Sequence, residues 1–265
     1  MKRLDDLGTR RQLFRFAAVG AASVPFLALA NRAAHALGFN PGGGGNNRGG
    51  GGCCCLLKGT RVSTPSGGRL VQDLQIGDEV HTLSGRRAVR WIGYNKFTKD
   101  EGRPWPSSVM PVRVAPFAID DETPHRDLYL SPEHCVFFNE ALIPVRYLVN
   151  QISIVPAMPS GMTAIEYYHI EFETHEVIYA EGAPVESFLD GQQREFFSNF
   201  VQYERLYGRE DQPRMTPYAP VLGYRNRREK VTGLARSAVS NVIDVRDPIQ
   251  VARDQLARRA RAMLV

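Results

Sequence analysis

Two short segments of the chain carry residue types that can perform acyl chemistry. The first is a run of three cysteines, Cys53, Cys54 and Cys55, directly after a glycine-rich stretch. The second is the segment 131–134, Ser-Pro-Glu-His, in which a hydroxyl and an imidazole are three positions apart. A cysteine thiolate can attack the peptide bond on its own N-terminal side, and a histidine can polarise that bond and protonate the leaving nitrogen. The residues therefore predict chemistry on the chain itself.

The cysteine count argues against a disulfide framework. The chain has four cysteines, three of them consecutive and the fourth, Cys135, far away in sequence. Neighbouring cysteines do not easily form an unstrained disulfide, because the bond requires a narrow range of Cα separations. No Cys-x-x-Cys spacing typical of zinc sites is present, so a site built from Cys53, Cys54, His125 or His169 is the less favoured interpretation. We expect a free thiol, no metal and no cofactor.

The N-terminal segment has the pattern of an export signal. Arg10 and Arg11 precede a short apolar run at residues 17–30, and small-residue cleavage motifs follow it. That run is too short for a membrane span, which needs roughly 20 residues. The paired arginines resemble a twin-arginine signal of bacteria, so residues 1–36 predict a periplasmic or extracellular protein. The alternative is an N-terminal amphipathic helix with an incidental arginine pair on a cytoplasmic protein.

Residues 37–52 are expected to be a linker. Eight of the twelve residues in the segment 41–52 are glycine. Such a composition cannot bury enough apolar surface to order itself and behaves as a flexible coil. A flexible linker would also keep the bond before the cysteines accessible.

Charge divides the chain into three parts. Residues 1–52 carry 7 basic and 2 acidic side chains, residues 53–190 carry 12 and 18, and residues 191–265 carry 14 and 8. The last part reads as a basic, partly helical tail, with helices expected at residues 194–207 and 248–264. We expect no specific nucleic-acid partner; contact with an anionic membrane and packing on the chain's own acidic domain both remain open for this tail.

The acidic middle of the chain is predicted to be mostly β. Short alternating segments separated by turn residues are expected to be strands, among them residues 61–64, 135–138 and 165–172. A hairpin is expected from strands 79–83 and 88–92, with residues 84–87 as its turn, because Gly85 supplies the unusual φ angle. No long amphipathic pattern precedes residue 190, so the helices belong to a C-terminal extension.

This β-rich region resembles the Hint domain, the autoprocessing fold shared by inteins and the C-terminal part of Hedgehog proteins. Residues 55–67 and 74–80 resemble the family's opening segments, and residues 130–134 are similar to its Thr-x-x-His block. Residues 175–188 resemble the closing block of bacterial Hint domains. The resemblance covers residues 53–190, and it implies a compact all-β horseshoe with pseudo-twofold halves.

The resemblance also implies a role for single residues. Cys55 matches the nucleophile, which converts the peptide bond between Cys54 and Cys55 into a thioester. His134 matches the histidine that polarises this bond and helps to protonate the leaving nitrogen. Ser131 stands where the family usually has threonine, and the hydroxyl is retained. His175 is a further candidate, which could assist the second step.

The closing block departs from that of inteins. Inteins end on His-Asn, where the asparagine cyclises, whereas this chain has Glu186-Ser187, which cannot form the succinimide. We therefore expect single-turnover cleavage or transfer of the N-side segment without splicing, by hydrolysis of the thioester or by its capture by an external nucleophile. Cleavage would release only the signal and the linker, so the alternative is a catalytically inert Hint-fold module for binding or secretion.

Overall fold

The computed structural model describes residues 54–99, 102–190, 194–208, 214–223 and 247–264. All the described residues belong to one unit of the chain, Pro41–Val265. The expected export signal, the linker and Cys53 lie outside the described residues.

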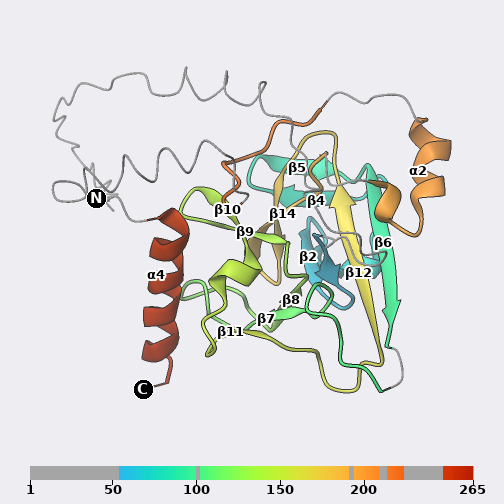
Figure 1. Cartoon of the computed structure of the whole chain (residues 1–265). Coiled ribbons are helices and arrows are strands. Elements are labelled where there is room, and N and C mark those ends of the chain that lie inside the picture. Colours follow the sequence, from blue (N-terminus) through green and yellow to red (C-terminus); the bar gives the residue numbers. More distant parts are fainter. Residues whose placement is uncertain (1–53, 100–101, 191–193, 209–213, 224–246, 265) are drawn as a thin grey trace, which may run out of the picture. The chain divides into compact units, whose positions relative to one another are not determined.

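Most of the regular secondary structure in the described residues is β-strand, and the strands pair antiparallel (Figure 1), which confirms the predicted fold class. One sheet has six strands in the order β11-β7-β8-β1-β12-β6. Their bounds are β1 Leu56–Leu57, β6 Trp91–Thr98, β7 Val112–Val114, β8 Leu128–Leu130, β11 Ile154–Pro156 and β12 Ala164–Glu171. Although β1 has only two residues, it lies in the middle of this sheet between β8 and β12.

The second sheet has eight strands. Six follow the order β10-β9-β14-β13-β2-β3, while β4 pairs with β13 and β5 pairs with β4. Their bounds are β2 Arg61–Thr64, β3 Gly67–Leu70, β4 Glu79–Thr82, β5 Gly85–Ala88, β9 Cys135–Phe138, β10 Ala141–Pro144, β13 Val177–Ala180 and β14 Ala183–Glu186. Val136 of β9 lies opposite Val185 of β14, so this sheet brings the segment after His134 next to the end of the closing block.

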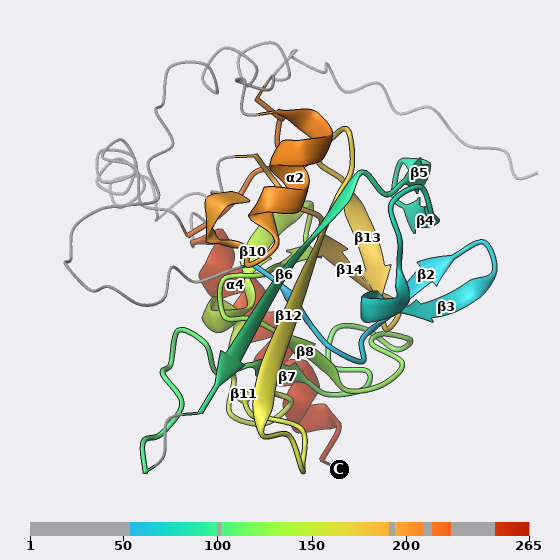
Figure 2. The same cartoon turned by 90° about the vertical axis from the view of Figure 1, so that its right-hand side faces the viewer.

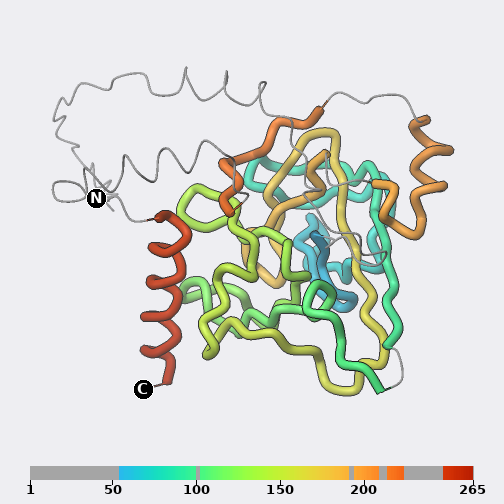
Figure 3. The backbone as a smooth tube through the Cα atoms, viewed as in Figure 1, coloured from blue at the N-terminus to red at the C-terminus, as the bar shows by residue number. Residues whose placement is uncertain are grey.

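The first described strands lie among strands that follow much later in the sequence. Figure 3 shows this in the backbone trace, where the blue segment passes between green and yellow segments. Leu56 pairs with Leu130 on one side and with Tyr168 on the other. Its side chain belongs to the main cluster of buried apolar side chains, together with Val62, Leu130 and Val136. The junction before Leu56 is therefore surrounded by strands on both sides.

The hairpin expected near residue 85 is present, but its predicted boundaries are wrong. The turn consists of Leu83 and Ser84 alone, and Gly85 begins the returning strand, which ends at Ala88. The Thr82 hydroxyl closes this turn, since it donates to the Gly85 carbonyl at 2.9 Å and accepts from the Ser84 N–H at 3.1 Å. Gly85 has a φ of 106°, which a side chain would disfavour. The predicted strand 88–92 is replaced by the start of β6 at Trp91.

The predicted helix at 194–207 is interrupted. It consists of the 3₁₀-helix η4 (Arg194–Phe196) and the α-helix α2 (Phe200–Tyr207). Asn199 lies between them and binds β6, because its side chain donates to the Ile92 carbonyl at 2.8 Å and accepts from the Tyr94 N–H at 2.9 Å. These two bonds fix the chain at a position where a continuous helix would have to pass.

Aromatic packing and a buried ion pair hold this segment on the sheet. Figure 2 shows α2 beside the end of β6. The rings of Phe197 and Tyr203 have their centroids 5.5 and 5.2 Å from that of the buried Trp91. The Arg194 guanidinium contacts both carboxylate oxygens of the fully buried Glu171, at 2.9 and 3.1 Å. The segment directly after residue 193 is thus part of the core around Cys55.

The C-terminal helix α4 (Pro248–Ala262) agrees with the helix predicted at 248–264. The Asp247 side chain caps it by accepting from the Ile249 N–H at 3.0 Å, and proline suits the first helical position. Ala252, Leu256 and Ala260 are buried along one face, and Arg259 binds Asp121 at 2.8 Å.

Arg253, Arg258 and Arg261 of the same helix are exposed, so membrane contact through them stays a prediction. Within the described ranges, no helix has both the length and the apolar character needed to cross a bilayer.

Candidate functional site

The junction residue Cys55 lies at the start of β1, in the interior of the protein. Its side chain is 0% exposed and belongs to an apolar cluster with Leu57, Trp91 and Phe188. The β1–β8 pairing continues one residue beyond Leu56, because the Ser131 N–H donates to the Cys55 carbonyl at 2.9 Å. The strand pairing thereby places Ser131 directly beside the bond between Cys54 and Cys55.

The Ser131 hydroxyl contacts the nitrogen of that bond. The Cys55 N–H donates to Ser131 Oγ at 2.7 Å, and both residues are buried. Ser131 opens a tight turn that His134 closes, since the His134 N–H donates to the Ser131 carbonyl at 3.0 Å. An ion pair between Glu133 and Arg146 and a bond from the Val145 N–H to the His134 carbonyl hold the turn in place. The Ser-x-x-His spacing thus brings a hydroxyl and an imidazole to one peptide bond.

The His134 imidazole is completely buried. Burial is the main cause that lowers its pKa to about 3, and the nearby His175 acts in the same direction. Hydrogen bonding to the Cys54 backbone raises the pKa, which is the effect of a carbonyl acceptor on an imidazole N–H. Neither ring nitrogen has a hydrogen bond of regular geometry within the described residues. A neutral imidazole therefore lies beside the Cys54 carbonyl, with its hydrogen-bonding capacity largely unused.

The His175 imidazole is buried too, but both of its nitrogens are occupied. The Tyr218 N–H donates to Nδ1 at 2.9 Å, so the ring proton is on Nε2, which donates to the Ser187 carbonyl at 3.2 Å. Burial lowers its pKa to about 4. The structure therefore brings Cys55, Ser131 and His134 together at the bond after Cys54. His175 instead binds the Ser187 carbonyl, near the other end of the closing block.

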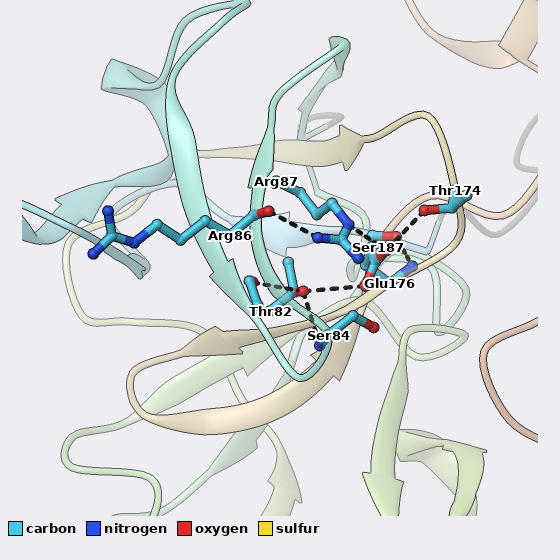
Figure 4. Close-up of polar contacts among 8 residues, drawn as sticks. Thr82, Ser84, Arg86, Arg87, Thr174, Glu176 and Ser187 are labelled. Carbon is cyan, nitrogen blue, oxygen red and sulfur yellow. Dashed lines mark hydrogen bonds and ion pairs between the residues drawn. The ribbon is translucent and has the colours of Figure 1, made fainter.

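The closing block is fixed by a second polar network, centred on Glu176 (Figure 4). The Glu176 carboxylate accepts from Thr174 and Arg87 at 2.7 and 3.0 Å. It also lies 3.1 Å from the Thr82 hydroxyl, whose single proton is shared with the Gly85 carbonyl. Burial alone would raise the pKa of Glu176, but these bonds bring it below its usual range. The Glu176 N–H donates to Ser187 Oγ at 2.8 Å, so the residue in the place of the intein asparagine has a structural partner.

The comparisons with known proteins agree with this architecture. The family model of the Hint domain matches residues 54–192, which is slightly more than half of the chain. The chain belongs to the Hint domain family. This is a family of autoprocessing domains, and the match contains Cys55, Ser131, His134 and His175.

Solved structures similar to this Hint protein include inteins and an intein-like domain. The gp41-1 intein is 17% identical with a TM-score of 0.33, and 50% of this chain aligns with 98% of the intein. For the MchDnaB-1 intein (N145AA) the identity is 14%, the coverage 50% and 99%, and the TM-score 0.34. A bacterial intein-like domain from Clostridium thermocellum is 9% identical, with coverage of 51% and 98% and a TM-score of 0.29. No match was found among curated proteins.

Two further buried titratable residues of the Hint domain, His169 and Glu186, are not among the catalytic candidates of the sequence analysis, which considers His169 only as a less favoured metal ligand. The His169 ring centroid lies 5.3 Å from that of His134, and burial lowers its pKa well below the usual value. Alternation along β12 could have revealed it, because Ile165, Tyr167 and His169 are successive inward positions. The second residue is Glu186, which the sequence analysis considers only as part of the Glu186-Ser187 pair of the closing block; its side chain is 1% exposed.

Within the ranges that the structure describes, no three His, Cys, Asp or Glu side chains are arranged to hold a metal ion. Cys54, Cys55 and Cys135 are buried, and none of the three forms a disulfide. The groups that the structure places at the junction are a thiol, a hydroxyl and a neutral imidazole.

Proposed function

We propose that this Hint protein cleaves or transfers its own N-side segment through an N–S acyl shift at Cys55. The Cys55 sulfur forms a bond to the carbonyl carbon of Cys54, the bond from that carbon to the Cys55 nitrogen breaks, and the thiol proton ends on the new α-amine. The resulting thioester is then hydrolysed by water, or captured by an external nucleophile as the acyl acceptor, and the Cys55 thiol leaves. Each molecule reacts once.

The observation that carries this proposal is the pair of contacts on the two sides of one peptide bond. Ser131 Oγ accepts from the Cys55 nitrogen at 2.7 Å, and the neutral His134 imidazole lies beside the Cys54 carbonyl. A hydrogen bond to the carbonyl oxygen stabilises the negative charge that develops there during attack. Proton transfer to the leaving nitrogen needs an acid–base group within reach. His134 is our candidate, because it closes the tight turn that begins at Ser131, the residue bound to this nitrogen.

Splicing is not part of the proposal. The residues in the place of the intein His-Asn pair are Glu186 and Ser187, and the Ser187 hydroxyl accepts from the Glu176 N–H. A serine side chain has no amide nitrogen to cyclise. The C-side bond is therefore expected to stay intact.

A second candidate function is a catalytically inert Hint-fold module that binds a partner or serves secretion. The observation in its favour is the burial of the junction: Cys55 is 0% exposed, so an external nucleophile has no open path to a thioester there. A module of this kind keeps the same fold while the bond after Cys54 stays intact.

The test is the mass of the purified chain, starting near Asn31 and carrying an N-terminal tag, followed over hours with and without thiol or hydroxylamine. We expect cleavage between Cys54 and Cys55, and its loss in Cys55→Ala. Cys53→Ala is the matched control from the same cysteine run and should still be cleaved. A folded wild-type chain that stays intact under every condition would favour the inert module.

Export is proposed together with this function, because the twin-arginine-like pattern would deliver a folded domain. Changing both arginines, Arg10→Lys and Arg11→Lys, should retain the protein in the cytoplasm of a host that has this export route. Fractionation measures the result, and unchanged export of the double variant would contradict the proposal.

A further inference from the structure

The side chain before the scissile bond is enclosed by the protein. Cys54 is 6% exposed, although it is the first residue that the structure describes. Its thiol lies 3.4 Å from the Glu133 carbonyl and also contacts the Glu186 carboxyl, so its single proton is shared between these two acceptors. The Cys135 thiol lies beside it, 3.8 Å from the same Glu133 carbonyl. Three separate segments of the chain therefore meet around one small side chain.

Burying the Glu186 carboxyl at this position costs folding free energy. Its carboxyl is buried at the end of β14, and no ion pair is found for it within the described residues. Burial raises its pKa to about 7, while bonds from the Cys135 N–H, at 2.8 Å, and from the two thiols act against the rise. A buried carboxyl without a cation destabilises a fold unless its hydrogen bonds are satisfied. The partners that satisfy it are Cys135 and Cys54, which lies directly before the bond to be cleaved.

We propose that Glu186, the Glu133 carbonyl and Cys135 form a binding subsite for the side chain that precedes the scissile bond, and that this subsite takes a small side chain with a hydrogen-bond donor. The inference rests on the proposed function, because it names the part of the N-side segment that the site recognises. Glu186 is a positioning residue in this subsite, since it acts on the bond through Cys54.

The geometry gives the subsite a mechanical role. Cys54 is held by its thiol, and the next residue is held by the bond from the Cys55 N–H to Ser131 Oγ. With both neighbours fixed, the carbonyl between them has little freedom to turn away from His134. Small misplacements of a reacting group are known to cost large factors in rate. A side chain without a donor would leave the buried Glu186 carboxyl with one partner fewer, and a larger side chain would displace the Cys135 thiol.

The test measures cleavage of the full chain for substitutions at position 54. We expect Cys54→Ser to be about threefold slower than wild type, Cys54→Ala about tenfold slower, and Cys54→Leu at least about a hundredfold slower. Equal rates for the serine, alanine and leucine variants would overturn the proposal.

A double-mutant cycle separates positioning from a general structural effect. Glu186→Leu should slow cleavage about tenfold in the wild-type background and by less than about twofold in the Cys54→Ala background, because the contact is then already lost. Glu186→Gln, which can still accept from the Cys135 N–H, should recover most of the rate. The matched control is Glu140→Gln in the exposed turn between β9 and β10, which should leave cleavage unchanged. Equal, additive losses in both backgrounds would overturn the role of Glu186.

One arm does not depend on cleavage. In Cys55→Ala, alkylation of Cys54 by iodoacetamide is followed by peptide mass analysis, with the urea-unfolded chain as the reference. Protection of Cys54 that is lost on adding Glu186→Leu supports the subsite even if the wild-type chain does not cleave itself. Alkylation of Cys54 in the folded chain as fast as in urea would overturn the subsite, whatever the outcome for cleavage.

Discussion

The two ends of this Hint domain use their buried polar groups in different ways. At the junction, neither nitrogen of His134 has a hydrogen bond of regular geometry among the described residues, and the ring lies beside a peptide carbonyl. At the closing end, His175 uses both nitrogens, and the Ser187 hydroxyl accepts from the Glu176 N–H. An imidazole whose N–H has no regular hydrogen bond can donate to an oxygen on which negative charge develops. An imidazole with both nitrogens hydrogen-bonded must first break one of these hydrogen bonds. The comparison suggests that the junction keeps reactive groups and that the closing end has become a support.

The largest expected effect is at His134. His134→Gln keeps a donor of similar size but cannot exchange a proton, so cleavage after Cys54 should slow by about 10²–10⁴-fold, or roughly 3–5 kcal/mol of activation free energy. The rate is measured by mass spectrometry of the purified chain, with thermal unfolding as a check on folding.

His81→Gln is the matched control for this variant, because His81 is a partly buried histidine that binds Ser63 at 3.1 Å, on β4. A His134→Gln chain that cleaves as fast as the His81→Gln chain would remove the distinction between the two ends.

The next effect is on stability in acid. Burial holds the pKa values of His134 and His175 at about 3 and 4 and that of His169 well below its usual value, so all three are neutral in the folded state. The unfolded chain binds these protons below about pH 6.5, so the stabilisation is present above that pH and is lost as the pH falls. Between pH 6.5 and 4.5, protonation of the unfolded chain at His134 and at His175 should each cost about 2 kcal/mol of unfolding free energy.

Glu186 acts in the opposite direction. Its pKa of about 7 is above the value of an unfolded glutamate, so its contribution is present in acid and is lost as the pH rises toward 7. The histidines outnumber it, and a net loss on the order of a few kcal/mol is expected. Urea unfolding of Cys55→Ala at pH 6.5 and 4.5 measures this, and His169→Phe should make the loss smaller. Equal stability at the two pH values would contradict the buried neutral cluster.

The third effect concerns the nitrogen side of the bond. Ser131→Ala removes the acceptor of the Cys55 N–H and leaves a buried donor without it, so cleavage should slow by about tenfold. Ser131→Thr restores a hydroxyl and should recover most of the rate. Quenched time courses of cleavage measure both variants. If Ser131→Ala cleaves as fast as wild type, the contact to the Cys55 nitrogen does not contribute to the rate, and only the contact at the Cys54 carbonyl remains to explain catalysis.

Much of the fold could be predicted, because it depends on local patterns. The strand expected at 61–64 and the one at 135–138 have the bounds of β2 and β9, and the strand expected at 165–172 differs from β12 by one residue at each end. The break at Asn199 could not be predicted, since it depends on hydrogen bonds to a strand about a hundred residues earlier. Local helix propensity contains no information on such a contact.

The site could be predicted only in part, for the same reason. The Ser-x-x-His motif is local, so the sequence could point to Ser131 and His134, and the structure places both beside the bond after Cys54; their catalytic roles stay a prediction. Whether a carboxylate is buried depends on the strand that packs over it, and Glu186 is enclosed by β9 through the Cys135 N–H. A glutamate near the end of a domain is usually exposed, which is why its role in holding Cys54 was not anticipated.

The smallest expected effect is at His175. His175→Gln keeps a donor for the Ser187 carbonyl and loses the acceptor of the Tyr218 N–H, so the free energy of unfolding should fall by about 1 kcal/mol. Cleavage should change by no more than about threefold, because the closing block is still held by Glu176 and Ser187. Urea unfolding and the cleavage time course are measured on the same preparation. A cleavage loss as large as that of His134→Gln would mean that His175 takes part in the chemistry despite its two partners, and the closing end would then be reactive as well.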